Sequence, residues 1–305
     1  MSPGASSGVS PCILTDTQFH RLRELVASFC GLHLSEDARG RLARTVESRL
    51  RVGFGQDVDA YADHLEADRG ATGELACLVD EITNNETYFF REEQQLEAFS
   101  EKILPELIQR QGRRHRLCLW SAGCSSGEEP LTLAMLLTQS GLWEKRLSHI
   151  SVHILGTDVC RPMILKARRA HYGASSFKGL SQDRRREVKM RFFHKEGEGA
   201  VPRLELRQLV SYLHLNLLDS DGQALFGEMD AIFCRNVLMY LLAPHRQRVI
   251  QGFFRKLSPG GYLLLGHSEN LLGMETPFEA LRLRGTLVYR KPRRPKAGFG
   301  QGWEL

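Results

Sequence analysis

The chain has 305 residues, of which 42% are hydrophobic and 25% charged, a composition typical of a soluble globular protein with room for more than one domain. No stretch approaches the roughly 20 apolar residues of a membrane helix, and the polar start does not resemble a secretory signal, so we expect a cytoplasmic protein without membrane insertion. The net charge of +5 does not indicate nucleic acid, because residues 290–305 hold five basic residues and one acid and leave the rest nearly neutral.

The seven cysteines are odd in number, and none of them forms a C-x-x-C pair. Several stand inside apolar runs of the sequence. This pattern predicts neither a zinc site nor a disulfide framework. We therefore expect reduced thiols and no bound metal.

The N-terminal part of the chain predicts a small all-helical domain over residues 14–85. It follows a Gly/Ser/Pro-rich segment, residues 1–13, that we expect to be disordered. The T-x-x-Q motif from Thr15 to Gln18 resembles a capping box, and apolar residues at helical spacing follow it as far as Gly31. Further helices are expected over residues 35–52, 58–67 and 72–82.

The second of these predicted helices is amphipathic. Helical spacing places basic residues on one face and apolar residues on the other, namely Arg41, Arg44 and Arg51 opposite Ala38, Leu42, Val46 and Leu50. Two interpretations stay open at this point. The basic stripe is either a solvated charged face or a surface that docks on an acidic helix.

From residue 86 to 291 a helical segment over 91–111 gives way to short apolar strands that alternate with helices. The strands are expected at 116–120, 151–157, 212–217, 230–234, 262–266 and 286–290, and the helices at 128–137, 161–169 and 245–257. This alternation predicts an α/β fold, a mostly parallel sheet with helices on both faces. Such sheets bind ligands outside the carboxyl ends of their strands.

Residues 171–209 interrupt this alternation with a polar and highly charged segment. Its RFF at 191–193, KEGEG at 195–199 and alternating RLELR at 203–207 predict a small antiparallel β subdomain inserted into the larger domain. The chain then closes with a basic Pro/Gly-rich tail, residues 292–305.

The segment WSAGCSSGEEP, residues 120–130, is a glycine-rich turn between a predicted strand and a predicted helix. It lacks the lysine of a phosphate-binding loop, and Glu128 and Glu129 would repel phosphate while favouring a positively charged ligand. The same acids could serve only the helix dipole, which is worth about 0.3–1 kcal/mol each.

Asp158 ends the next predicted strand, where an acid of a dinucleotide-type sheet accepts hydrogen bonds from ribose hydroxyls. Taken alone, Asp158 could equally cap the helix that follows. The turn and the acid together predict an adenosine with a positively charged, phosphate-free extension. S-adenosylmethionine fits that description, whereas NAD and ATP fit poorly.

Six ordered segments resemble the chemoreceptor protein-glutamate O-methyltransferases, the CheR family. They are TNNETYFFRE (83–92), WSAGCSSGEEP (120–130), GTD (156–158), LNLLD (215–219), AIFCRNVLMYL (231–241) and GGYLLLGHSEN (260–270). The resemblance implies a small helical domain joined to a Rossmann-like S-adenosylmethionine domain, residues 86–291, with a three-stranded antiparallel subdomain inserted in it. It also implies S-adenosylhomocysteine as the product.

The resemblance assigns cofactor contacts to Asn85, Thr87, Arg91, Glu129, Asp158, Asn216, Leu217, Arg235 and Asn236. Within this set Asp158 would bind the ribose, Asn216 and Leu217 would flank the adenine, and the Arg235-Asn236 pair would close the methionine side. Catalytic roles fall to Arg91, which would orient the acceptor carboxylate, and to Tyr240.

Several of these residues have structural alternatives. Asn85 could be a helix N-cap, and Asn236 could satisfy the backbone of a buried loop. We expect His267 to be structural, and we expect Cys124 to be tolerated in the turn without a catalytic role.

The reaction that the resemblance implies is methylation of glutamate side chains in the cytoplasmic helical bundle of methyl-accepting chemoreceptors, by a monomeric enzyme. A glutamate with a pKa of about 4.3 is already a nucleophile at neutral pH, so no general base is needed. Two alternatives stay open: a methyltransferase for RNA or a small molecule, and a non-catalytic cofactor-binding adaptor.

Overall fold

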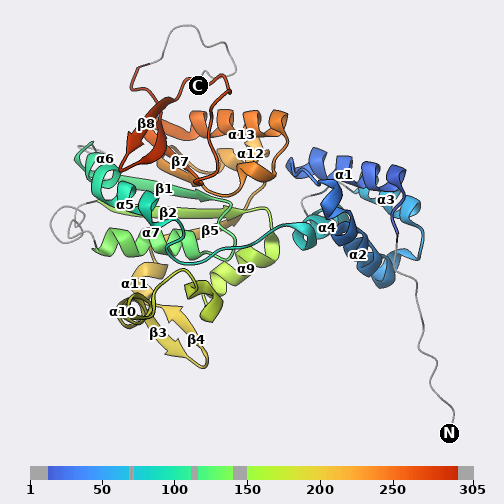
Figure 1. The fold of residues 1–305 in the computed structure, drawn as a ribbon, viewed down its shortest axis with the longest axis horizontal. Helices are drawn as coiled ribbons and strands as arrows, with labels where there is room; N and C mark the ends of the chain where they lie inside the picture. The colour runs from blue at the N-terminus through green and yellow to red at the C-terminus, as the bar shows by residue number, and fades with distance from the viewer. Residues whose placement is uncertain (1–12, 69, 71, 111–115, 140–149, 295–305) are drawn as a thin grey trace. The chain divides into compact units, whose positions relative to one another are not determined.

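The computed structural model describes residues 13–68, 70, 72–110, 116–139 and 150–294. Residues 1–12 of the segment expected to be disordered and residues 295–305 of the expected basic tail lie outside the described residues. The chain divides into two compact units, Met1–Asn84 and Asn85–Leu305 (Figure 1).

The first unit is helical and begins as the capping box predicts. In α1 (Asp16–Cys30) the backbone N–H of Gln18 donates to Thr15 Oγ1 at 3.3 Å, and the Thr15 N–H donates to Gln18 Oε1 at 3.1 Å. Gly31 ends the helix with a φ of 79°, in the left-handed region where glycine carries no steric penalty. This predicted helix is confirmed at both ends.

The second predicted helix is confirmed in position but consists of three pieces: η1 (Glu36–Ala38), α2 (Arg39–Arg49) and the π-helical η2 (Leu50–Phe54). Its amphipathic pattern is confirmed, because the three arginines are exposed and the apolar side chains of the opposite face are buried or half-buried. Two further helices complete the unit, α3 (Val58–Ala67) and α4 (Glu74–Ile82).

A buried ion pair joins three of these helices. The guanidinium of Arg49 in α2 binds Glu74 in α4 through two bonds, Nε to Oε1 at 2.7 Å and Nη2 to Oε2 at 2.6 Å. Tyr61 in α3 donates its hydroxyl to the same carboxylate at 2.8 Å. Burial by itself would raise the pKa of Glu74, but the bonds from Arg49 and Tyr61 outweigh burial and lower the pKa.

We expect Glu74→Gln to destabilise the helical unit by about 1–3 kcal/mol at neutral pH, the usual cost of removing one partner of a buried charged bond. A carboxyl group with a lowered folded pKa stabilises above its unfolded pKa of about 4.3, and this contribution disappears as the pH falls through the folded value. Hydrogen exchange of the α2 and α4 amides in the full chain measures the effect, which should shrink below about pH 4.

The matched control is Glu47→Gln, because Glu47 at the end of α2 pairs with the exposed Arg51, four residues later in η2. An exposed pair of this kind is worth only about 0.3–0.5 kcal/mol. Equal effects of the two substitutions would contradict the role that we give to Glu74.

The second unit is built on a seven-stranded sheet of order β5-β2-β1-β6-β7-β9-β8. Its strands are β1 (Arg116–Ala122), β2 (Ser151–Asp158), β5 (Val210–His214), β6 (Met229–Cys234), β7 (Leu257–Leu265), β8 (Glu279–Leu283) and β9 (Thr286–Arg290). In the sheet, the five neighbouring strands β5, β2, β1, β6 and β7 pair in parallel. The β8–β9 hairpin pairs antiparallel with β7 and forms one edge of the sheet. This mostly parallel sheet with an antiparallel edge is the Rossmann-like α/β arrangement that the sequence predicts.

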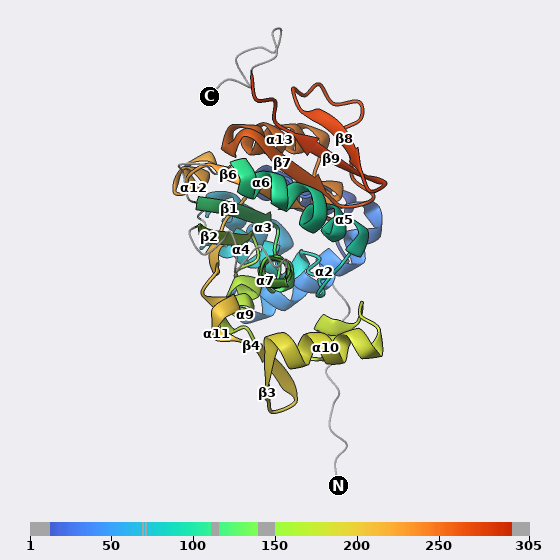
Figure 2. The same cartoon turned by 90° about the vertical axis from the view of Figure 1, so that its left-hand side faces the viewer.

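Helices cover both faces of the sheet, as predicted. Figures 1 and 2 show α7 (Glu128–Gln139) and α9 (Arg161–Arg169) on one side of the strands and α13 (Ala243–Lys256) on the other. A short helix, α12 (Ser220–Ala224), links β5 to β6. The carboxyl ends of β1, β2 and β6 lie side by side at one edge of the sheet, because β1 pairs in parallel with both of the other strands.

Several boundaries differ from the sequence expectation; β5 and β7 begin earlier than expected, at Val210 and Leu257, and two further differences lie in segments that carry predicted site residues. The helical segment expected from residue 91 begins at α5 (Glu93–Ala98) and continues through η3 (Phe99–Ile103) and α6 (Leu104–Arg110), because Phe90 and Glu92 have positive φ angles of 59° and 55°. Strand β5 ends at His214, so Asn216 and Leu217 lie in the loop that follows and not in the strand.

The inserted segment is more helical than its sequence predicts. It contains α10 (Gln182–Phe192), the antiparallel pair β3 (Phe193–Glu196) and β4 (Gly199–Pro202), and α11 (Leu204–Arg207). The strand expected at 203–207 is wrong: Leu206 is buried but Leu204 is 63% exposed, so this segment does not bury one face of a strand. In place of a third strand, a single antiparallel bridge joins Tyr172 to Ala200.

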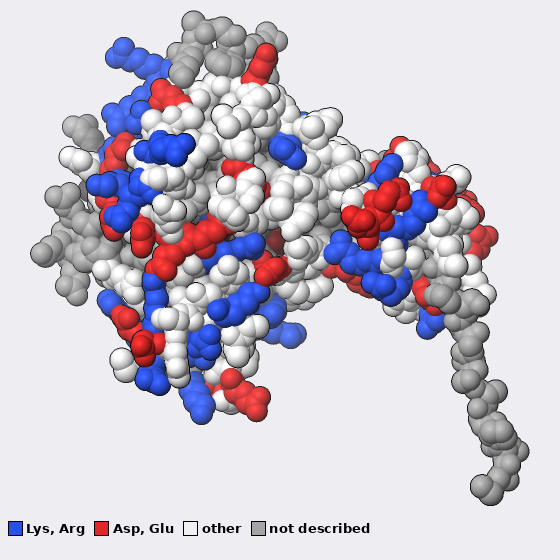
Figure 3. All heavy atoms as spheres, in the orientation of Figure 1, with Lys and Arg blue, Asp and Glu red and all other residues white. Residues whose placement is uncertain are grey.

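Within the described ranges no helix is long and apolar enough to cross a membrane. The same residues contain no cluster of three side chains suited to hold a metal ion. On the face of the sheet unit that Figure 3 displays, basic and acidic side chains are interspersed and do not form a field of one sign.

Candidate functional site

The glycine-rich turn between β1 and α7 lies at the carboxyl end of the central strand. Gly123 has a φ of 84°, and a Cβ there would lie 2.4 Å from Val237 Cγ2; Gly127 has a φ of 93°, and its Cβ would lie 2.7 Å from Tyr212 Oη. Both positions therefore require glycine. The N–H groups of Gly123 and Cys124 donate to the Thr157 carbonyl at 2.8 and 2.9 Å, which fixes the turn against β2.

The two glutamates after the turn have different partners. Glu128 is 1% exposed and accepts hydroxyl bonds at 2.7 Å from Ser126 and from Ser176 of the inserted segment. Glu129 accepts from Ser121 Oγ at 2.6 Å and pairs with Arg235 at 3.0 Å. Glu128 thus binds hydroxyl groups inside the protein and fixes the turn, whereas Glu129 belongs to a network of charged residues that includes Arg235.

Asp158 ends β2 beside the turn and is 8% exposed. One carboxylate oxygen accepts the backbone N–H of Ser125 at 2.7 Å, and the other accepts that of Cys160, the N-cap of α9, at 2.9 Å. The helix-capping alternative is not confirmed, because the N-cap of α9 is Cys160 and no side-chain bond caps the first turn of that helix. The two oxygens of a carboxylate offer about four acceptor positions in all.

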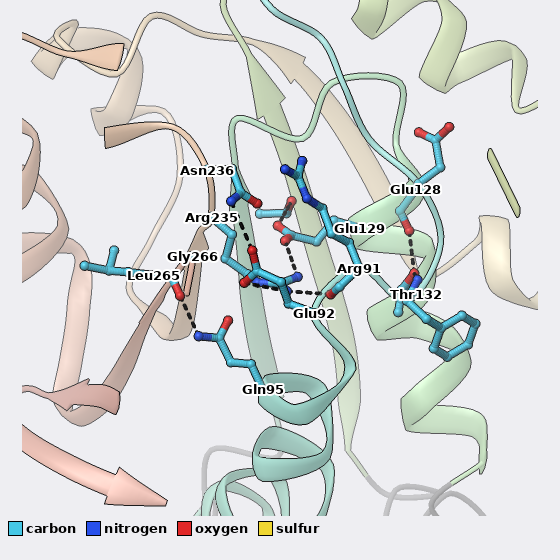
Figure 4. A network of polar contacts seen from close by, with 12 residues as sticks. Arg91, Glu92, Gln95, Glu128, Glu129, Thr132, Arg235, Asn236, Leu265 and Gly266 are labelled. Atoms are coloured by element: carbon cyan, nitrogen blue, oxygen red, sulfur yellow. Dashed lines mark hydrogen bonds and ion pairs between the residues drawn. The ribbon is translucent and has the colours of Figure 1, made fainter. Parts of the chain in front are cut away.

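Arg235 and Glu92 form the centre of the network in front of the turn (Figure 4). The Arg235 side chain is 3% exposed; it pairs with Glu129 at 3.0 Å and Glu92 at 3.3 Å, and donates to the Arg91 carbonyl at 2.5 Å. Glu92 also accepts Asn236 Nδ2 at 3.0 Å. One buried cation thus holds two carboxylates from distant parts of the chain.

Glu92 remains ionised in this setting. Burial opposes its charge, but Arg235 and the donors on His267 and Asn236 outweigh burial and lower the pKa of Glu92 below its ordinary value. The backbone N–H and the Nδ1 of His267 both lie 3.0 Å from this carboxylate. The His267 side chain is 76% exposed, so Glu92 orients it at the rim of the site.

Glu269 shapes the loop after β6. Its carboxylate accepts four backbone N–H bonds, from Asn236 at 2.7 Å, Gly266 at 2.8 Å, Val237 at 2.9 Å and Met239 at 3.0 Å. These bonds hold Asn236 at a φ of 60°, in the left-handed region that non-glycine residues seldom adopt.

Sequence reasoning missed the roles of Glu92 and Glu269. The available signal was position, since each acid stands in a segment that carries the family resemblance, TNNETYFFRE or GGYLLLGHSEN. Nothing in the local pattern indicates which backbone or side-chain donors such an acid will meet.

Two buried polar atoms of this network have no hydrogen-bond partner among the described residues, Arg235 Nε and Asn236 Oδ1. Figure 4 shows the Asn236 amide and the Arg91 guanidinium directed to the same side of the Glu92–Arg235 pair. An unpaired buried donor beside an unpaired buried acceptor suits a ligand that carries both a carboxylate and an ammonium group. The amino-acid end of S-adenosylmethionine has both groups.

Two protein-family comparisons cover most of the chain. The family described as CheR methyltransferase, SAM binding domain, matches residues 85–286, and the CheR methyltransferase all-alpha domain matches residues 17–83. The chain belongs to the CheR methyltransferase family. It is accordingly an S-adenosylmethionine-dependent methyltransferase that binds this cofactor through its sheet unit.

Curated relatives of this CheR-family chain match it over nearly their whole length. Chemotaxis protein methyltransferase 2 of Vibrio cholerae is 31% identical over 93% of this chain and 96% of its own. Chemotaxis protein methyltransferase 1 of Pseudomonas aeruginosa is 31% identical over 90% of this chain and 98% of its own. An RNA methyltransferase structure from Salinibacter ruber is 15% identical, and the match covers 66% of this chain and 97% of that chain with a TM-score of 0.34.

The CheR fold brings some of the other predicted residues to the glycine turn. The Asn85 carbonyl accepts Ser125 Oγ at 2.9 Å, and its side chain contacts Cys160 Sγ at 3.6 Å, in a stretch that is not helical, so Asn85 is not an N-cap. The Leu215 N–H donates to the Asp158 carbonyl at 2.9 Å, which brings the loop of Asn216 to the end of β2.

Other predicted residues are placed less directly. Asn216 accepts the N–H of Leu218 at 3.0 Å, and the Leu217 carbonyl accepts Gln223 Nε2 at 2.8 Å. Thr87 is half-buried between Asn85 and Arg91 in the chain, and the half-buried Tyr240 ends η6 (Leu238–Tyr240), in the loop that carries Asn236.

Cys124 packs inside the turn of this CheR chain with 1% exposure. Burial raises the pKa of its thiol well above the ordinary range, and the carboxylates around it act in the same direction. The thiol therefore stays neutral at physiological pH, which fits the expectation of a tolerated residue without a catalytic role.

Proposed function

We propose that this CheR-family enzyme transfers the methyl group to glutamate side-chain carboxylates of chemoreceptor-type signalling proteins and forms glutamyl methyl esters. The observation that carries the proposal is the contrast between two arginines. Arg235 is paired with two carboxylates, whereas Arg91 donates to the Glu86 carbonyl at 2.8 Å and makes no ion pair within the described residues. A cation beside the cofactor site that is not neutralised suits an anionic acceptor.

When bound, S-adenosylmethionine supplies a sulfonium methyl group, and its transfer to a carboxylate oxygen breaks the carbon–sulfur bond, leaves the electron pair on sulfur and moves no proton. The acceptor glutamate is ionised at neutral pH, so the enzyme needs no general base. The remaining task is alignment, which can lower a barrier by about 7–11 kcal/mol in well-oriented systems. We assign this task to Arg91 and to Tyr240, which ends η6 in the loop after β6.

The cofactor contacts follow the same proposal. Arg235 and Asn236 would hold the amino-acid end of the cofactor with Glu129, and Asp158 would accept the ribose hydroxyls. The remaining contacts would come from Asn85, Thr87 and Arg91 on the segment before α5 and from Asn216 and Leu217 beside the adenine.

The test of the reaction uses methyl-labelled S-adenosylmethionine and membranes that carry chemoreceptors, followed by mild base. Volatile labelled methanol would identify a carboxyl ester and support the proposal. Label that stays on protein after base would contradict it and indicate an N-methylated product. Label on RNA or on a small molecule would contradict the receptor as substrate.

The proposed partner is the acidic helical bundle of a receptor, and the proposed docking face is the arginine face of α2 and η2. Arg41 and Arg44 are exposed and make no ion pair among the described residues, whereas Arg51 pairs with Glu47 at 2.5 Å. We therefore assign the docking charge mainly to Arg41 and Arg44.

We expect the double reversal Arg41→Glu, Arg44→Glu to lower kcat/KM for receptor about tenfold at low salt, because like charges now meet across the interface. The loss should shrink as salt rises, since exposed charges are screened. S-adenosylhomocysteine affinity should not change. Arg282→Glu, an exposed residue of β8, is the control; an equal loss with this variant, or none with the double reversal, would contradict the docking face.

A further inference from the structure

We propose that the inserted segment, residues 171–209, is part of the cofactor-binding apparatus, and that its Tyr172 and Ser176 are positioning residues for the glycine turn. They act through Ser126 and Glu128 and do not touch the cofactor themselves. The proposal rests on the cofactor and not on the identity of the methyl acceptor.

Ser176 holds Glu128 in place. Its hydroxyl donates to Glu128 Oε1 at 2.7 Å, while Ser126 Oγ of the turn donates to Oε2 at 2.7 Å. Glu128 is 1% exposed and Ser176 is 5% exposed, so water does not reach these groups. Loss of either hydroxyl would therefore leave a buried carboxylate oxygen without a donor, which is costly. The first carboxylate of α7 is thus shared between the turn and the inserted segment.

Tyr172 supports the turn from the same side. Its hydroxyl donates to the Ser126 carbonyl at 2.9 Å, and Tyr212 of β5 donates to the Gly127 carbonyl at 3.5 Å. Both hydroxyls lie within 3.0 Å of where a Cβ on Gly127 would be. The turn therefore rests against two tyrosines, and only one of them belongs to the sheet.

The same two residues connect the turn to the rest of the inserted segment. Tyr172 exchanges backbone bonds with Ala200 of β4, N to O at 3.0 Å and O to N at 2.9 Å. The Ser176 carbonyl accepts the N–H of Phe89 at 2.8 Å, and the Phe89 ring lies 5.0 Å from Tyr172 and 5.2 Å from Phe193 of β3.

Phe89 stands two residues before Arg91, so the inserted segment contacts both walls of the site, the glycine turn and the stretch that carries Arg91 and Glu92. A displacement of the β3–β4 hairpin cannot leave both walls unchanged. Cofactor affinity should therefore depend on hydroxyl groups that lie outside the site itself.

Calorimetric titration of the full chain with S-adenosylhomocysteine tests this inference. We expect Ser176→Ala and Tyr172→Phe each to weaken binding by roughly tenfold, within the range for a buried acceptor that loses its donor. KM for S-adenosylmethionine should rise by a similar factor, with kcat at saturating cofactor nearly unchanged. The control is Ser175→Ala, because Ser175 is the exposed neighbour of Ser176 and should bind as the parent does.

A double-mutant cycle separates positioning from general stability. If Ser176 acts through Glu128, then adding Ser176→Ala to Glu128→Gln should cost less than Ser176→Ala costs alone. Full additivity, or a fall in melting temperature with an S-adenosylhomocysteine Kd within twofold of the parent, would overturn the inference. Tyr172→Phe removes a single oxygen atom and keeps the test decisive if Ser176→Ala does not fold. Since no acceptor is present, the result is independent of the proposed glutamate methylation.

Discussion

Replacing Arg235 with alanine is expected to abolish measurable S-adenosylhomocysteine binding and to lower the free energy of unfolding by about 3–5 kcal/mol. The Arg235 side chain is 3% exposed and is the cation within ion-pair distance of both Glu92 and Glu129. Without it, two half-enclosed carboxylates face each other across the methionine side with no compensating charge. Repulsion between them should pull residues 91–92 away from the turn.

Calorimetry and chemical denaturation measure the two effects of Arg235→Ala. The control is Arg186→Ala, which removes an exposed arginine of α10 and should change neither quantity by more than about 0.5 kcal/mol. Arg235→Lys retains the positive charge but lacks the planar guanidinium group that binds two carboxylates at once. It should recover part of the free energy of unfolding but little of the S-adenosylhomocysteine affinity. A variant Arg235→Ala that binds S-adenosylhomocysteine normally would remove Arg235 from the site.

Replacing Arg91 with alanine is expected to lower kcat about 100-fold, the cost of losing alignment of a reacting group, with a much smaller change in S-adenosylhomocysteine affinity. The backbone carbonyl and the side-chain guanidinium group of Arg91 have different roles. The Arg91 carbonyl helps to hold Arg235 and survives the substitution, whereas the guanidinium is the part directed to the open side of the network.

Single-turnover measurements with receptor membranes give the chemical step for Arg91→Ala directly. Arg91→Lys is the informative companion, because it restores charge but cannot form two parallel bonds to a carboxylate. Its rate should lie between those of the parent and of Arg91→Ala. Full turnover by Arg91→Ala with normal cofactor binding would show that another group orients the acceptor.

Much of the sheet and of the cofactor turn was predictable because the relevant signals are local. The glycine spacing of residues 123–127, the acid that ends β2 and the alternation of strands and helices each depend on a few neighbouring residues. The inserted segment was less predictable. Its RLELR segment alternates as a strand would, but only one of its two leucines meets an apolar surface, and that surface comes from elsewhere in the fold.

The different roles of Glu128 and Glu129 could not be predicted from the local sequence pattern. Both acids stand in the first turn of α7 and are equivalent in the sequence. Ser176, 48 residues away, and Arg235, 106 residues away, distinguish them. Glu269 is a similar case, because three of its four partners are backbone groups of a loop 30 to 33 residues earlier, and no residue pattern reveals the conformation of that loop.

The sequence by itself determined the ligand class and the family. An acidic, glycine-rich turn followed by a strand-end acid excludes phosphate and favours a cationic adenosine ligand, and the six segments resemble one methyltransferase family. Only the tertiary structure decided which carboxylate is an anchor, which one faces Arg235, and that the inserted segment braces the turn. The physical reason is that charge and backbone geometry are local properties of the chain, whereas the partner of a buried polar group is set by which distant segments the fold brings within hydrogen-bond distance.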